Sequence, residues 1–151
     1  MFAAALLLAG LSPPARGVAA QQSEATNPGL EKARSLAESQ HEIVSILIRK
    51  KEYEKALEEA GKIFDMKWPA DQEPVLLKSL LSLSGKFLHE GQANHGLQLL
   101  ERNRKSFRVV DSRVSILKEM GYLYKNLGND DKALECFREA QRLESGAARK
   151  P

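Results

Sequence analysis

The chain has 151 residues, of which 42% are hydrophobic and 28% charged, a composition typical of one globular domain and not of a disordered or membrane-embedded chain. Lys and Arg number 23 against 20 Asp and Glu, which leaves a formal charge of +3. This excess is too small to indicate by itself an acidic polymer or a membrane surface as the partner.

The N-terminal segment differs in character from the rest of the chain. An apolar run over residues 2–11 is followed by two prolines and by small residues up to Ala20. The run is shorter than the roughly 20 apolar residues that a membrane-spanning helix needs, and the pattern is typical of a secretory signal peptide. We expect a bacterial signal peptide over 1–20, cleaved near Ala20, a disordered linker over 21–29, and a periplasmic or secreted mature protein. The alternative is a disordered apolar extension, because no Lys or Arg precedes the run.

The sequence carries no feature that would anchor the mature chain in a membrane. Residues 7–11, "LLAGL", are similar to a bacterial lipoprotein box, but Leu11 stands where the acylated cysteine would be. We therefore expect no stable membrane anchor. The single cysteine, Cys136, cannot form an internal disulfide, and it lies between Glu135 and Phe137 with no His or Asp beside it. It is interpreted as a small helix residue and not as a nucleophile.

From Leu30 onward, apolar residues recur at intervals of three and four, which predicts helices, and no alternating run is long enough for a sheet. The fold class is expected to be all-α. Gly91 and Gly128 are predicted as left-handed C-terminal stops, and Asp111 and Asp130 as caps of the last two helices. A loop is predicted over 67–73, and six helices are predicted over 30–51, 53–66, 74–90, 92–107, 112–127 and 131–144.

Small and aromatic residues follow a fixed pattern near the C-terminus, in "EMGYLYKNLGNDDKALECF" at 119–137. Over residues 114–147 this pattern resembles the tetratricopeptide repeat, whose two helices are written W-x2-L-G-x2-Y and A-x3-F. Small residues allow the two helices to cross closely, and aromatic residues fill the space beside the contact. The matching residues are Leu117, Met120, Gly121 and Tyr124 in the first helix and Ala133 and Phe137 in the second.

Two further copies of the repeat are predicted upstream. "KKEYEKAL" replaces the glycine turn in the earlier copy, over 37–70. The small second-helix residues Ala56, Gly96 and Ala133 are 40 and 37 residues apart instead of 34, so the extra residues are placed in the loops containing Trp68 and Val110. The core positions are Leu47 and Ala56 in the copy at 37–70, and Leu80, Leu83, Phe87, Gly96 and Leu100 in the copy at 77–110.

The resemblance implies a right-handed superhelical stack of three antiparallel hairpins, a tetratricopeptide-like α-solenoid over 30–147, followed by a disordered tail at 148–151. Members of this family bind extended or helical peptide segments of partner proteins in a concave groove lined by the first helices. Ile48, Leu81 and Tyr122 are the candidate apolar anchors. By repeat position, the groove residues would be His41, Ser45, Ile48, Arg49, Lys78, Leu81, Ser82, Leu88, His89, Ser115, Lys118, Glu119, Tyr122 and Lys125.

The expected function is therefore a non-catalytic protein–protein interaction module whose partner is a protein or peptide. No nucleophile elbow, glycine-rich phosphate loop, H-E-x-x-H or zinc-type cysteine pair occurs, and no cofactor or metal is expected. Family members that hold acidic C-terminal tails use Lys, Asn and Arg at groove positions. Here His41, Ser45, Ser82, Ser115 and Glu119 stand at such positions, so acidic tails are not expected as the main ligands of the groove.

Two residue clusters suggest other ligands. A basic cluster at 102–113 makes an RNA-binding or anion-binding helical repeat an alternative, but cations near a helix end also complement the helix dipole, and no stacking aromatics are interleaved. Nucleic acid is therefore not expected. His89 and His95 flank a glycine turn without a third metal ligand. The basic cluster comprises Arg102, Arg104, Lys105, Arg108 and Arg113.

Self-association is the remaining alternative. Repeat arrays usually end in a polar capping helix, and none follows the last predicted hairpin. Leu134 and Leu143 would then be partly exposed, which predicts a weak homodimer through the C-terminal hairpin or coverage of this hairpin by a partner.

Overall fold

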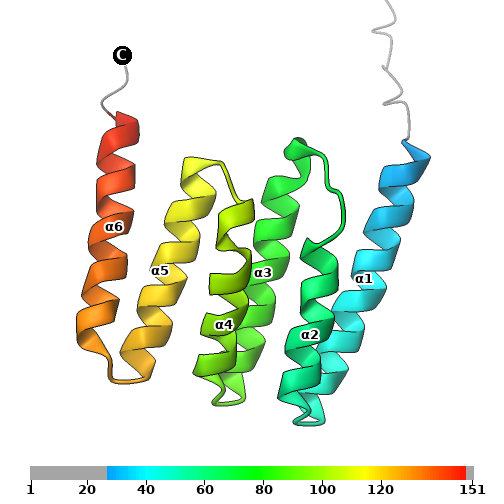
Figure 1. The fold of residues 1–151 in the computed structure, drawn as a ribbon, viewed down its shortest axis with the longest axis horizontal. Coiled ribbons are helices and arrows are strands. Elements are labelled where there is room, and N and C mark those ends of the chain that lie inside the picture. Colours follow the sequence, from blue (N-terminus) through cyan, green and yellow to red (C-terminus); the bar gives the residue numbers. More distant parts are fainter. Residues whose placement is uncertain (1–26, 149–151) are drawn as a thin grey trace, which may run out of the picture.

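The computed structural model describes residues 27–148 as six α-helices in three antiparallel hairpins, with no strand in this range (Figure 1). The predicted all-α stack of helical hairpins is confirmed. The signal peptide predicted over 1–20 lies outside the described residues. The helices are α1 (Pro28–Arg49), α2 (Tyr53–Phe64), α3 (Glu73–His89), α4 (Ala93–Asn103), α5 (Val110–Asn126) and α6 (Asp130–Ala148), with short 3-10 helices η1 (Ala70–Gln72) and η2 (Arg104–Ser106).

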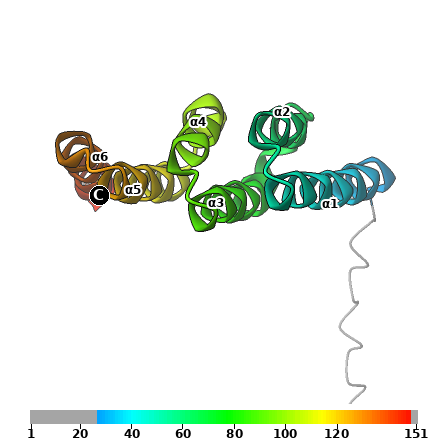
Figure 2. The ribbon, with the colours of Figure 1, turned by 90° about the horizontal axis from the view of Figure 1, so that it is seen from below.

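The first helices of the hairpins, α1, α3 and α5, lie in one row, and α2 and α4 form a second layer on one side of it (Figure 2). Helix α4 packs against α2, α3 and α5. Helix α6 packs extensively against α5 but, among the described residues, makes no comparable contact with α4. The last hairpin therefore departs from the two-layer arrangement of the first two.

All three hairpins turn in the same way. At each turn one residue adopts a positive φ: Gly91 and Gly128 at 72° and Lys51 at 62°. The N–H of the following residue donates to a carbonyl five residues earlier, and these carbonyls belong to Leu47, Phe87 and Tyr124. This pattern is the Schellman motif, in which glycine is favoured because it has no Cβ. The predicted glycine stops are confirmed, and Lys51 occupies the glycine position of the first hairpin.

The core is shared between hairpins. One apolar cluster runs from Val44 in α1 to Cys136 in α6, and it includes Phe87, which is fully buried. A smaller cluster between α5 and α6 is formed by Val114, Leu117 and Ala140, with Leu143 packed against it. Because α6 is covered mainly by α5, most of its apolar contacts are confined to its own hairpin.

The small residues of the repeat pattern lie where helices approach each other closely. A Cβ placed on Gly121 would lie 2.7 Å from Cζ of Phe137, and one on Gly96 would lie 3.3 Å from both Leu123 and Ser84. Both glycines are buried. Phe137 itself is half-buried. Glycine is required at 121 because the Phe137 ring occupies the space that a side chain would fill.

Several helix ends differ from the prediction. Helix α1 begins at Pro28, where Asn27 accepts hydrogen bonds from the N–H groups of Gly29 and Leu30, so residues 28–29 belong to a helix and not to a linker. Residue 148, predicted as part of the tail, is the last residue of α6. Helix α4 ends at Asn103, and η2 follows where the prediction continued the helix to 107.

The two predicted aspartate caps are wrong. Helix α5 begins at Val110, so Asp111 lies inside its first turn, and the carboxylate of Glu73 accepts the N–H groups of Arg108 (3.1 Å) and Val109 (2.9 Å) just before it. Asp130 is the first residue of α6, and Asn129 Oδ1 accepts the N–H of Lys132 (3.2 Å). The α5 start is thus held by a carboxylate from α3, some 35 positions earlier in the chain.

Replacing Lys51 by glycine should stabilise the protein. A left-handed conformation costs a residue other than glycine about 1 to 2 kcal/mol, and replacement by glycine removes this cost. Because glycine makes the unfolded chain more flexible, about 0.5 to 1 kcal/mol of the gain is lost, and we expect a net stabilisation of about 0.5 to 1 kcal/mol. Urea unfolding of Lys51→Gly against the parent measures it. Gly91→Ala is the matched reverse change and should lose stability; a Lys51→Gly variant that is less stable than the parent would contradict the turn assignment.

Replacement by alanine should lower the free energy of unfolding at one glycine and raise it at another. Gly121→Ala forces the Phe137 ring to move and should lower the free energy of unfolding by about 1 to 3 kcal/mol. Gly85→Ala, inside α3 with nothing within 4 Å of the added Cβ, should raise it by about 0.5 to 1 kcal/mol through helix propensity. Thermal or urea unfolding of both variants tests the pair, and a stabilising Gly121→Ala would show that α5 and α6 do not cross closely there.

The Glu73 contact should appear in the acid dependence of stability. Burial, the largest single influence, raises the pKa of Glu73, but the N–H groups of Arg108 and Val109 and the Ser112 hydroxyl together hold this pKa below its ordinary value. A lowered pKa means that the ionised carboxylate stabilises the fold at pH values above the unfolded pKa of about 4.3, and that this contribution is lost as pH falls through the folded pKa.

Glu73→Gln should therefore be less stable than the parent at pH 7, by about 1 kcal/mol as for a weakened helix cap. The difference should shrink when urea unfolding is repeated below pH 4. A difference that stays constant between these pH values would mean that the charge of Glu73 does not hold α5.

Candidate functional site

The predicted groove residues belong to α1, α3 and α5, and the surface of this row that faces away from α2 and α4 is called here the first-helix face (Figure 2). The residues differ widely in exposure. Ser45 and Ile48 are buried. His41, Leu81, Leu88, Ser115, Lys118 and Glu119 are half-buried, and Arg49, Lys78, Ser82, His89, Tyr122 and Lys125 are exposed.

Ile48 cannot anchor a peptide on this face. Its side chain is 2% exposed and belongs to the shared core, because the C-terminal half of α1 is covered by α2 and approached by α3. Ser45 is also buried, and its hydroxyl donates to the carbonyl of His41 (2.8 Å) and accepts from Nζ of Lys86 (2.9 Å). Lys86, which the prediction missed, therefore links α3 to α1. Its position four residues after Ser82, one helical turn further along α3, could have indicated it.

His41 is the titratable group of this region with a shifted pKa. Burial is the largest cause and lowers the pKa of His41, and the neighbouring Lys86 ammonium lowers it further, against a smaller opposite effect of Glu42. The imidazole is consequently neutral at pH 7, and it can offer one donor and one acceptor nitrogen to a ligand.

A hollow of about 490 Å³ opens between α1 and α3 beside His41, and it is called here the α1–α3 hollow. Its position is fixed by hydrogen bonds in the loop after α2: Trp68 Nε1 donates to the carbonyl of Ile63 (2.7 Å), and Arg34 of α1 donates to Gln72 Oε1 (2.7 Å). The lining is largely apolar, with charged residues at the α1 side. It consists of Arg34, Ala37, Glu38, His41, Glu42, Ile63, Trp68, Val75, Leu76 and Ser79.

Of the fourteen predicted groove residues, His41 alone lines this hollow, and those of α5 lie elsewhere. Glu119 lies toward α3, where its carboxylate accepts a weak hydrogen bond from Ser84 (3.3 Å). Lys118 lies toward α6 and forms an ion pair with Glu144 (2.6 Å). Tyr122 is 57% exposed and packs edge-on against Phe137 of α6, with ring centroids 5.2 Å apart. The α5 residues therefore border the last hairpin more than the α1–α3 hollow.

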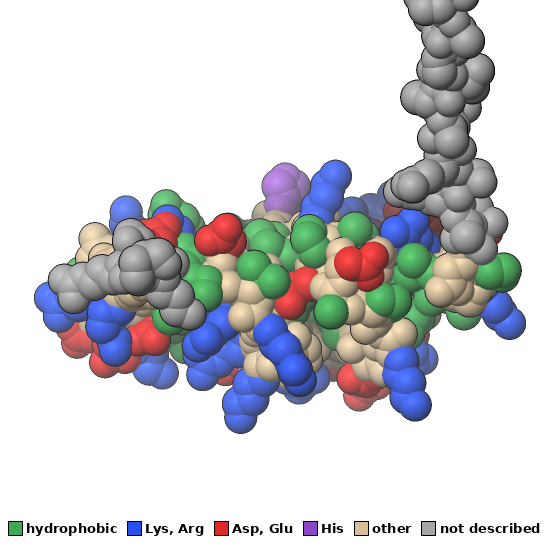
Figure 3. Space-filling view, turned by 90° about the horizontal axis from the view of Figure 1, so that it is seen from above, with side chains coloured by type: hydrophobic (Ala, Val, Ile, Leu, Met, Phe, Trp, Pro, Cys, Tyr) green, Lys and Arg blue, Asp and Glu red, His purple; other side chains and the backbone are tan. Residues whose placement is uncertain are grey.

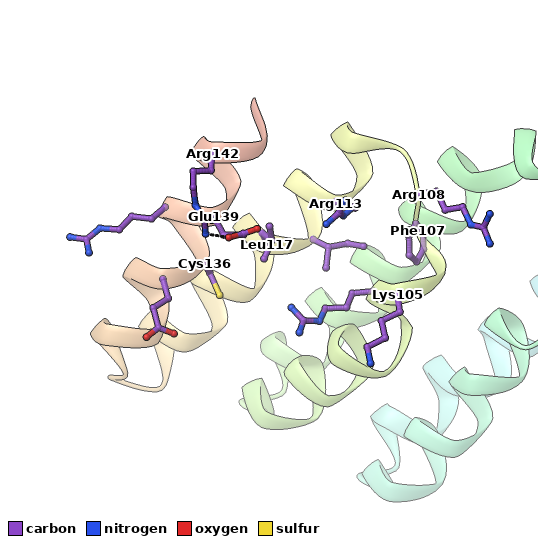
Figure 4. A pocket seen from close by; sticks show the side chains of 12 residues that line it. Lys105, Phe107, Arg108, Arg113, Leu117, Cys136, Glu139 and Arg142 are labelled. Carbon is purple, nitrogen blue, oxygen red and sulfur yellow. Dashed lines mark hydrogen bonds and ion pairs between the residues drawn. The ribbon is translucent and has the colours of Figure 1, made fainter. Parts of the chain in front are cut away.

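The predicted basic cluster borders a second and larger hollow, of about 1020 Å³, between η2 and α6 (Figure 4). It is called here the α4–α6 hollow. Arg102 does not line it, whereas Arg138 and Arg142 of α6, which the prediction missed, do. Their spacing of four residues on one helix could have indicated a shared face. The lining residues are Arg104, Lys105, Phe107, Arg108, Arg113, Ile116, Leu117, Glu135, Cys136, Arg138, Glu139 and Arg142.

His95 and Cys136 pack against other side chains, whereas His89 is exposed. His95 stacks on Phe87 and contacts Tyr53, with its Nε2 2.9 Å from Glu54 Oε1, whereas His89 is exposed at the end of α3. Within residues 27–148 no group of three or more His, Cys, Asp or Glu side chains is placed to hold a metal ion. Cys136 is buried, and burial raises the pKa of its thiol, which disfavours the reactive thiolate.

None of the helices in the described part of the chain is both long and apolar enough to cross a bilayer.

One hairpin of the chain matches a known protein family. A family model for the tetratricopeptide repeat matches residues 114–147, which lie in α5 and α6 and the turn between them. Comparisons with curated proteins and with solved structures gave no match. The first two hairpins repeat the turn of the matched one, with Lys51 and Gly91 at the position of Gly128, and they stack against it through a shared core. The chain is an all-helical repeat protein whose last hairpin is similar to the tetratricopeptide repeat.

Proposed function

We propose that the protein is a non-catalytic interaction module that binds a peptide segment of a partner protein on the first-helix face. Tetratricopeptide repeats generally mediate protein–protein interaction. The observation that carries the proposal for this chain is the α1–α3 hollow, an open site with Trp68, Val75 and Leu76 in its lining and neutral His41 at its edge. A concave, largely apolar site with a few polar groups is the usual form of a ligand pocket.

The size and chemistry of the hollow favour an apolar anchor residue in the peptide. A volume of about 490 Å³ accommodates one or two large side chains but not a folded domain. Val75 is 54% exposed at its edge, so apolar surface is already available to solvent there. Exposed polar groups of the neighbouring helices, such as Glu38 and Lys78, can pair with the peptide's flanking residues.

The cell envelope is the proposed location, on the basis of the secretory pattern at 1–20. Sequencing the N-terminus of the protein recovered from an envelope fraction would decide it, and a chain that still begins at Met1 would refute export with cleavage near Ala20.

Self-association is the second candidate function, because Leu134 of α6 is 50% exposed. It is less well supported than peptide binding, since Leu143, the other predicted contact residue, packs against the cluster of Val114 and Leu117.

Peptide binding can be tested with ligands selected for the purpose. Peptides selected from a displayed library against the mature chain should carry an aromatic or large aliphatic residue, and Val75→Asp should weaken their binding about tenfold or more, because it puts a charge at the edge of an apolar pocket. Fluorescence anisotropy with labelled peptides measures the dissociation constants.

The matched control is Leu134→Asp, which changes a similarly exposed apolar residue on α6 and should leave the affinity unchanged. Selected peptides that are indifferent to Val75→Asp but lose affinity with Leu134→Asp would move the binding surface to the last hairpin and contradict the proposal.

A further inference from the structure

The α4–α6 hollow is a second surface, independent of the one proposed for peptide binding, and its charge is strongly one-sided. Two carboxylates, of Glu135 and Glu139, face the six cations of the lining. Arg142 pairs with Glu139, and within the described residues none of the other five cations forms an ion pair with a carboxylate. The cations are Arg104, Lys105, Arg108, Arg113, Arg138 and Arg142.

The cations stand on two opposite walls. Arg104 and Lys105 belong to η2, and Arg138 and Arg142 belong to α6. Figure 4 shows Lys105 and Arg142 on opposite sides of the hollow. On α6, lining residues recur at intervals of three and four, from Glu135 to Arg142, so they form one stripe of the helix. Seen from above, Lys and Arg side chains also project along the edge of the molecule on the α2 and α4 side (Figure 3). An anion entering the hollow would meet positive charge on both sides.

The floor of the hollow is apolar. It is formed by Ile116 and Phe107, which are almost fully buried, and by Leu117 and Cys136, which are each 9% exposed, so the aliphatic stems of the surrounding arginines add to the apolar surface that a ligand can reach. A small inorganic anion would leave this floor without a partner. The lining therefore suits a ligand that has an apolar stripe and anionic groups on either side of it.

The shape of the surroundings indicates a helix as the ligand. In the first two hairpins the second helices α2 and α4 pack against each other over the row of first helices. Among the described residues, α6 does not pack against α4 in the same way. The hollow lies over α5 between the end of α4 and α6, where a further second-layer helix would lie. Helices bind in such grooves through residues at i, i+3, i+4 and i+7.

Single-stranded nucleic acid fits this surface less well. Its recognition uses aromatic side chains on which bases stack. Phe107, the aromatic residue of the lining, is only 4% exposed, and Tyr122 packs against Phe137 elsewhere on the hairpin.

We propose that the α4–α6 hollow binds an amphipathic acidic helix of a partner protein. Leucine-type side chains of that helix lie against Leu117 and the aliphatic stems of the arginines, and its Asp or Glu side chains pair with Arg104 of η2 and Arg138 of α6. The protein then has two binding surfaces, and a partner on one leaves the other open.

A designed probe tests the proposal directly. The probe is a fluorescently labelled peptide of about 18 residues, five helical turns, with leucines at i, i+3, i+4 and i+7 and glutamates elsewhere. It should bind the mature chain, and Arg104→Glu and Arg138→Glu together should raise its dissociation constant at least about tenfold, because close charge pairs are reversed. A second probe with lysines in place of glutamates should prefer the doubly reversed variant.

Three controls separate the site from general charge attraction. A peptide of the same composition with the leucines scattered around the helix should bind at least about tenfold more weakly, because it cannot cover the apolar floor. Lys78→Glu, an exposed charge reversal on α3, should change the affinity by less than about twofold, as expected for a distant exposed charge. Circular dichroism and thermal unfolding of each variant should match the parent.

Several results would overturn the proposal. These are no binding of the leucine–glutamate probe, equal binding of the scattered peptide, an effect of Lys78→Glu as large as that of the double reversal, or displacement of the probe by oligouridylate that binds more tightly than the probe. An effect of Lys78→Glu as large as that of the double reversal would instead indicate that acidic helices bind on the first-helix face. Failure here is distinguishable from failure of the proposed function, because the selected peptides of that test depend on Val75 and not on Arg104 or Arg138.

Discussion

The structure depends on one constraint: each helical hairpin has more apolar surface than its own two helices can cover, so the hairpins must stack. The shared cluster that runs from Val44 in α1 to Cys136 in α6 is the result. Close approach at Gly96 allows this stacking, since a Cβ there would lie 3.3 Å from Leu123 of the next hairpin, and Gly121 allows the close crossing of α5 and α6 within the last hairpin. The stack leaves two kinds of surface free, the first-helix face and the edges of the second layer, and both carry hollows.

The position of α6 decides how these surfaces differ. Because α6 packs mainly on α5, the second layer is interrupted after α4, and the cations of η2 and α6 face each other across the α4–α6 hollow without carboxylates to neutralise most of them. Exposed like charges repel each other only weakly in water and salt, so the fold tolerates the arrangement. The α1–α3 hollow has a different character, with a neutral His41, apolar residues such as Trp68 and Val75, and charges of both signs at the α1 side. Two ligands of different chemistry are therefore compatible with one scaffold.

The helices and the repeat register could be predicted from the sequence because they depend on local spacing. Gly91 and Gly128 indicate their turns directly, and the family pattern at 114–147 gives the positions of the core residues around Gly121. The turn at Lys51 was placed by alignment alone, since nothing in its own residue type favours a positive φ. The turns and helices depend on residues within a few positions, although the α6 cap was assigned to Asp130 where the adjacent Asn129 forms it.

Features that depend on distant parts of the chain were not predicted. The start of α5 is held by Glu73 of α3, so a local search for a cap selected Asp111 wrongly. Ile48 has the helical phase of a groove residue but is buried, because α2 covers this part of α1 and α3 approaches it. The basic cluster at 102–113 indicates only part of the α4–α6 hollow, because Arg138 of α6, which also lines it, lies far along the chain. Tertiary packing, which spacing does not reveal, decides all three.

The central claim is that peptide recognition occurs on the first-helix face and is separate from the α4–α6 hollow. Amide chemical-shift mapping tests it most directly, by titrating the isotope-labelled mature chain with a library-selected peptide. The account predicts that shifts concentrate at residues 34–45 of α1 and 75–86 of α3, while residues 135–142 of α6 stay unchanged. Shifts confined to 104–117 and 135–142, with α1 unchanged, would contradict it.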